Sequence, residues 1–202
     1  MRNSLALFNS NITDARNISA LYEYLSSTVA APQSFDDLLR SQIVYSVSAF
    51  DKLIHDLIRI GMVEIFMGRR IPTPKYLSEP IPMQVHSEII LATIPPKEYI
   101  FEQAIFQKLK TVSYQDPSKV AEGLSYIWNE PQKWQKIATA MATTDKTART
   151  TLKLITDKRN SIVHEADIDP FTNAKFNINK TESESSLNFL YHCGNIIANL
   201  VI

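Results

Sequence analysis

The segment DKRNSIVHE, from Asp157 to Glu165, holds the side chains best suited to phosphate chemistry. It contains Arg159, Asn160 and His164. Arginine offers paired hydrogen bonds to phosphate oxygens, and histidine gives or takes a proton near neutral pH. An arginine followed by a histidine at this spacing is common by chance, so the spacing alone decides nothing.

The helix predicted around this segment places Arg159 on its apolar side. At about 100° per residue, Leu152 and Ile155 lie within about 40° of Arg159, whereas Asn160 and His164 lie between about 100° and 140° away. Burying a guanidinium without a partner is costly. Two interpretations therefore stay open: Arg159 serves function or an interface, or it binds a carbonyl or a core carboxylate.

Other chemistry-bearing residues give weaker patterns. Asp51 and His55 stand one helical turn apart and could share a metal, although a solvated helix face is the favoured interpretation. His86 has no partner cluster. His192 and Cys193 are adjacent and would point about 100° apart on a helix, which disfavours a nucleophile–base pair.

No phosphate loop, GxSxG nucleophile elbow or HExxH metal motif is present, and the single cysteine permits no internal disulfide. We therefore expect neither a metal nor another cofactor.

The rest of the sequence is typical of a helical protein. Four glycines in 202 residues are too few for the many hairpin turns that a β-rich protein of this length would need. We predict an all-α fold. The helix starts are signalled by Thr13 and by a capping box from Ser34 to Asp37. The predicted helices cover about 13–30, 35–67, a stretch after Pro95–Pro96, 117–129, 132–143, 146–164 and 182–202.

One region, residues 68–96, interrupts the helical pattern. Six of the ten prolines fall there, which excludes a continuous helix. We expect an irregular excursion with a short helix across His86–Ala92. Because neither side of it makes a complete core, residues 1–202 are predicted to form a single domain, with 1–33 as an N-terminal helical arm.

Charge and hydropathy narrow the class of protein. The net charge is zero, which excludes a strongly basic nucleic-acid coat protein. From 131 to 159, however, five lysines and two arginines face two aspartates, a net of +5 that suits a phosphate backbone. Trp128 and Trp134 could stack on bases, but core packing is favoured. The lack of a long apolar run predicts no membrane span and a cytoplasmic protein.

The segment RNSIVHEAD resembles the HEPN superfamily, whose mark is an arginine, four to six residues and a histidine on a late helix. The stretches SYQDPSKV, KWQKIA, TLKLITDKRN and SAFDKLIHDL extend the likeness over about residues 35–202. The subgroup it looks most like is that of RNA ligase–phosphatase-associated HEPN proteins. Lys158 departs from the pattern, because no acidic residue directly precedes Arg159.

The resemblance implies a helical domain that dimerises and cleaves RNA without a metal, at a cleft shared by both subunits. It makes His164 the general acid and base, Arg159 the phosphate clamp and Asn160 a supporting residue. It also implies a toxin or defence effector, with an antitoxin or defence-system protein as partner. The alternatives are a non-catalytic helical dimer that binds a partner protein or nucleotide, and a DNA-binding regulator, for which no recognition-helix pattern is seen.

Overall fold

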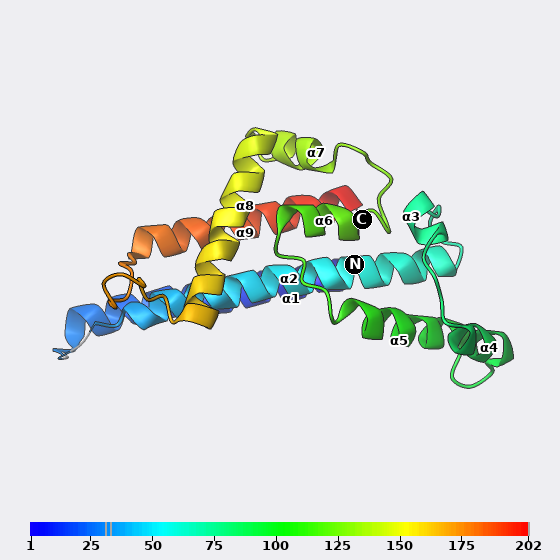
Figure 1. Cartoon of the computed structure of the whole chain (residues 1–202), viewed down its shortest axis with the longest axis horizontal. Coiled ribbons are helices and arrows are strands. Elements are labelled where there is room, and N and C mark those ends of the chain that lie inside the picture. Colours follow the sequence, from blue (N-terminus) through cyan, green and yellow to red (C-terminus); the bar gives the residue numbers. More distant parts are fainter. Residues whose placement is uncertain (31, 33, 202) are drawn as a thin grey trace.

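The computed structural model describes residues 1–30, 32 and 34–201, and this part of the chain forms nine helices and no strand. The all-α prediction is thereby confirmed. The central element is α2 (Asp36–Phe66), which α1 (Arg2–Thr28) follows in the antiparallel direction (Figure 1). The last helix, α9 (Lys180–Val201), packs against both. Position 202, where the predicted last helix ends, lies outside the described residues, as do positions 31 and 33 of the predicted arm.

The remaining helices are shorter, and three of them pack against α2: α5 (Lys97–Leu109), α6 (Pro117–Leu124) and α8 (Asp145–Glu165). In Figure 1, α8 crosses α2 steeply, while α5 runs beside it on the opposite side from α9. The others are α3 (Pro74–Leu77), α4 (Met83–Leu91) and α7 (Lys133–Ala140).

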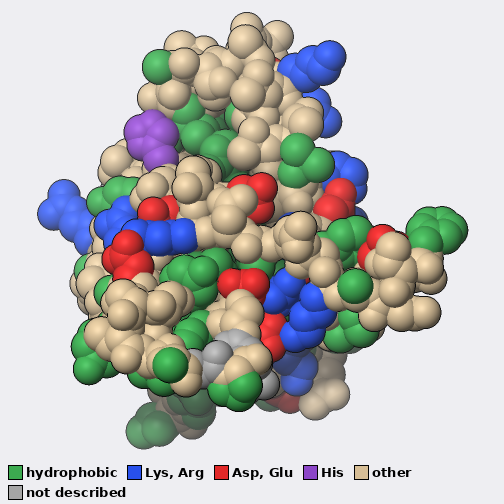
Figure 2. Space-filling model, turned by 90° about the vertical axis from the view of Figure 1, so that its left-hand side faces the viewer, with side chains coloured by type: hydrophobic (Ala, Val, Ile, Leu, Met, Phe, Trp, Pro, Cys, Tyr) green, Lys and Arg blue, Asp and Glu red, His purple; other side chains and the backbone are tan. Residues whose placement is uncertain are grey.

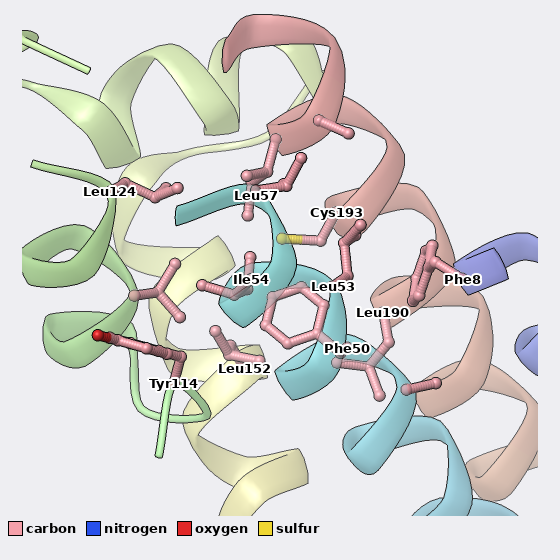
Figure 3. Close-up of a cluster of buried hydrophobic side chains, with 14 of the residues drawn as sticks. Phe8, Phe50, Leu53, Ile54, Leu57, Tyr114, Leu124, Leu152, Leu190 and Cys193 are labelled. Carbon is pink, nitrogen blue, oxygen red and sulfur yellow. The ribbon is translucent and has the colours of Figure 1, made fainter. Parts of the chain in front are cut away.

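The core forms around the apolar face of α2. Phe50, Ile54 and Leu57 repeat at helical spacing and are fully buried. Figure 3 shows side chains from α1, α6, α8 and α9 meeting this face, among them Phe8 and Leu190. α1 contributes Phe8, Ile12 and Ala15 to this core, so it packs along the bundle over its length.

One predicted helix start and one predicted cap are wrong. α1 begins at Arg2, and Thr13 lies inside it, where its hydroxyl donates to the Asn9 carbonyl at 3.0 Å. The capping box does not form either. Ser34 Oγ accepts the N–H of Asp36 at 3.1 Å, but Asp37 turns away to Lys175 and Arg40. The Asp37 carboxylate therefore pairs with one cation of its own helix and one from the loop before α9 in place of the local cap.

Two predicted helices are too long at their C-terminal ends. α6 stops at Leu124, because the next carbonyl, that of Ser125, accepts the Thr73 hydroxyl at 2.8 Å from the excursion. α7 stops at Ala140, just before Ala142 adopts a left-handed backbone with φ of 52°. The excursion over 68–96 is present and carries α3 and α4. The short helix predicted across His86–Ala92 corresponds to α4, which starts earlier, at Met83.

A buried carboxylate fixes the end of α8 to α2. Asp167 is fully buried and follows α8 in a left-handed backbone conformation, with φ of 58°. Its carboxylate accepts from Arg40 Nε at 2.8 Å and from Lys158 Nζ at 2.8 and 2.9 Å. Arg40 also donates to the Phe176 carbonyl, which holds the loop between α8 and α9.

The network reaches the surface through Asp37, which pairs with Arg40 at 3.2 Å and with Lys175 at 2.7 Å. Figure 2 shows acidic and basic side chains interspersed over one end of the molecule, with no large patch of either sign.

Replacing Asp167 with asparagine is expected to lower the free energy of unfolding by about 3 kcal/mol. The change keeps the shape and leaves Arg40 and Lys158 without their shared anion, and breaking a buried pair in this way typically costs about 3–5 kcal/mol. Urea denaturation followed by circular dichroism measures it. The matched control is Asp157→Asn, at an exposed i, i+4 pair with Lys153, which should cost under about 0.5 kcal/mol. Equal losses in both variants would mean that the buried charge is not what anchors α8.

Candidate active site

Arg159 lies where α8 meets α2. Leu152 and Ile155 are buried, as the helical wheel predicts, and Arg159 follows them half-buried. Its Nη1 donates to Asn160 Oδ1 at 3.0 Å. Its Nε is buried and has no hydrogen-bond partner among the described residues. Among the described residues, Arg159 therefore binds neither a carbonyl of the backbone nor a core carboxylate, so the interpretation of Arg159 as a structural cap is not supported.

The guanidinium lines a pocket of about 320 Å³ formed with α2 and the end of α5. Its basic and acidic residues are Lys52, Arg59, Lys110, Arg159, Asp51 and Asp56, and its apolar wall is Phe106 and Leu109. Asp56 pairs with Lys52 at 3.0 Å and with Arg59 at 3.1 Å. Arg59 also pairs with Glu102 of α5, so four basic side chains stand against three acidic ones, and the remaining excess of one positive charge suits an anion.

The Asp51–His55 pair, taken from the sequence as a solvated helix face, lines this same pocket. His55 Nε2 lies 3.8 Å from Asp51 Oδ1, and each side chain is about one-fifth exposed. Asp51 accepts the backbone N–H of Tyr114 at 2.6 Å, and the ring of His55 meets the Tyr114 ring edge-on at 4.7 Å between centroids. Burial raises the pKa of Tyr114 to about 12, so its phenol stays protonated at neutral pH.

His164 lies one and a half turns beyond Arg159 and is exposed to solvent. It is absent from the Arg159 pocket, so one protomer does not bring these two predicted site residues together. Asn160, the third, is half-buried and binds Arg159 through its amide oxygen. Asn160 therefore holds the guanidinium, whereas His164 stays free to meet a ligand from outside.

The other candidate residues from the sequence lie outside the Arg159 pocket. Cys193 is fully buried, which raises the pKa of its thiol to about 12, while His192 is exposed; the two cannot act as a pair. His86 is exposed on α4. Trp134 is buried and donates its indole N–H to the Pro117 carbonyl at 2.7 Å, so the core interpretation is confirmed for it.

Most of the basic run from 131 to 159 is paired. Lys136 binds Glu130, Arg149 faces Asp145 at 3.8 Å, and Lys153 faces Asp157 at 3.3 Å. The predicted basic approach is therefore largely neutralised along α7 and α8, and the positive excess is concentrated in the Arg159 pocket.

The described residues contain no group of three or more His, Cys, Asp or Glu side chains arranged to hold a metal ion. Over the same residues, none of the helices has the length and apolar character needed to cross a membrane.

Sequence reasoning missed that His55 belongs with Arg159. The two stand far apart in the chain, and the i, i+4 spacing of Asp51 and His55 says nothing about which helix covers them. Only the crossing of α8 over α2, and the loop that carries Tyr114, bring them into one pocket.

Comparison with known proteins identifies the family of the chain. No curated protein and no solved structure matches the chain. The model of the family described as RiboL-PSP-HEPN matches residues 9–202, which include α1 from its eighth residue onward and every later helix. The chain therefore belongs to the RiboL-PSP-HEPN family of the HEPN superfamily.

Proposed function

We propose that the chain is a metal-independent endoribonuclease that cleaves RNA by attack of the 2′-hydroxyl, at a site shared by two subunits of a homodimer. The observation that carries the proposal is the pairing, on one helix, of a half-buried guanidinium facing a positive pocket with an exposed imidazole. Membership of the HEPN superfamily supports it.

RNA cleavage of this type needs few protein groups, because the substrate supplies its own nucleophile. The 2′-oxygen forms a bond to phosphorus as the bond from phosphorus to the 5′-oxygen breaks. A base takes the 2′-hydroxyl proton and an acid protonates the 5′-oxygen, which leaves a 2′,3′-cyclic phosphate and a 5′-hydroxyl. His164 serves proton transfer, and Arg159 binds the phosphate oxygens as their charge rises.

The geometry of α8 supports the proposal of a dimer. Residues five apart on a helix are separated by about 140° and about 7.5 Å along the axis, so Arg159 and His164 of one copy do not converge on one phosphorus. Two-fold symmetry relieves this, because each subunit can complete the other's site.

Changing either site residue to alanine is expected to reduce cleavage of a mixed RNA pool by at least about a hundredfold. Arg159→Ala and His164→Ala should both leave the dimer folded, as judged by circular dichroism and light scattering. His192→Ala, at an exposed histidine on α9 outside the site, is the control. A His164→Ala protein that cuts at the wild-type rate would exclude this site.

The shared site is tested in the same assay by mixing the two inactive variants. Exchange of subunits should produce one intact site per mixed dimer and recover part of the activity. The complete absence of recovery would argue against sharing.

The proposed reaction leaves no step for a metal ion. Cleavage should therefore persist, within about twofold of the untreated rate, after dialysis against EDTA. Loss of activity in EDTA that returns with added Mg²⁺ would overturn the metal-free mechanism.

We further propose that the protein is a cytoplasmic toxin or defence effector, restrained by an antitoxin or another defence-system protein. The expected outcome is growth arrest when the chain is expressed alone in bacteria, relieved by His164→Ala at equal protein levels. Equal growth with both proteins would favour the alternative, a non-catalytic helical dimer that binds a partner protein or a nucleotide.

A further inference from the structure

The pocket that holds Arg159 contains a histidine to which the ribonuclease proposal gives no role. We propose that His55 is a second proton-transfer residue, acting on the phosphodiester that Arg159 of the same protomer binds. This inference rests on the proposed RNA cleavage and adds a catalytic residue from α2 to a site otherwise built on α8.

The reaction itself asks for two proton transfers at two different atoms. The attacking 2′-oxygen and the departing 5′-oxygen lie on opposite sides of the phosphorus, so one imidazole cannot reach both at once. If one proton moves through His164, the other needs a group near the phosphate clamp. His55 is the one histidine among the residues that line the Arg159 pocket.

The surroundings of His55 hold it in a defined place. Tyr114 packs against one side of its ring, and Asp51 lies 3.8 Å from its Nε2. Asp51 is itself fixed, because its carboxylate accepts the Tyr114 N–H at 2.6 Å and lies 3.4 Å from Gln115 Nε2. At 3.8 Å the Asp51 carboxylate is too far from Nε2 for a direct hydrogen bond, so it acts on the imidazole as a nearby negative charge, and the packing of Tyr114 positions the ring.

The charges around His55 favour an anion in the pocket. On α2 itself, Lys52 and Arg59 are engaged by Asp56, and Arg59 also pairs with Glu102 of α5. From the other elements, Lys110 after α5 and Arg159 on α8 line the pocket, and neither takes part in an ion pair among the described residues. Lys110 and Arg159 can therefore bind phosphate oxygens in the pocket that His55 also lines. The pocket volume of about 320 Å³ accommodates a phosphodiester with an attached ribose.

The first test is the cleavage rate. His55→Gln should slow single-turnover RNA cleavage by about a hundredfold or more, while His192→Gln, on the exposed face of α9, should leave the rate unchanged. A His55→Gln protein that cleaves at the wild-type rate, beside an inactive His164→Ala protein, overturns the role of His55 alone. A wild-type protein that cleaves no RNA overturns the ribonuclease assignment and this inference with it.

The second test does not depend on activity or on the folding of a His55 variant. An RNA oligonucleotide methylated at every 2′-oxygen lacks the nucleophile and stays intact, so it can be titrated into the wild-type protein while the four histidine ring signals are followed by NMR. The His55 signal should shift, and the shift should disappear in Arg159→Gln. A His55 signal that stays unmoved while the protein binds the oligonucleotide overturns the proposal, because a purely structural histidine would behave in this way.

Discussion

The geometry of the site depends on one buried anion. Asp167 has no solvent contact, yet it binds two cations that come from different helices, Arg40 of α2 and Lys158 of α8. A buried charge is tolerated only when its hydrogen-bonding capacity is met, so the two helices must meet at this point. Because Asp167 follows α8 directly, the same contact fixes the angle at which the preceding turns, with Arg159 and His164, leave the core.

This anchoring explains why one helix can be both core and site. The first half of α8 buries Leu152 and Ile155. Its last turns would otherwise be free to fray, since few apolar contacts hold them. The ion network replaces apolar packing there. It leaves the buried Nε of Arg159 without a hydrogen-bond partner among the residues that the structure describes, and it leaves His164 in solvent. A charged side chain on the apolar side of a helix is unfavourable. Arg159 occupies such a position because the ion network around Asp167 holds the end of α8 in place.

The sequence predicts the regular parts of the fold well and the tertiary contacts poorly. A proline-free run of apolar residues at helical spacing placed the helix over 35–67 within about one residue of α2, and 146–164 agrees as closely with α8. The predicted caps at Thr13 and Ser34 were wrong because longer-range packing and ion pairs decided those ends. The grouping of His55 with Arg159 could not be predicted, since it arises from the crossing of two helices and has no trace in local spacing.

The division of the proposed site between elements has a geometric cause. A straight helix turns successive side chains away from each other, so Arg159 and His164 five positions apart cannot both face one phosphorus. A chain can bring a second acid–base group to the arginine in two ways: from another copy of the same helix, or from a different helix of the same copy. In this fold α8 crosses α2 and brings Arg159 into one pocket with His55, so the second way needs no partner. A dimer would then add His164 to a pocket that the proposed phosphate clamp and the His55 imidazole already line.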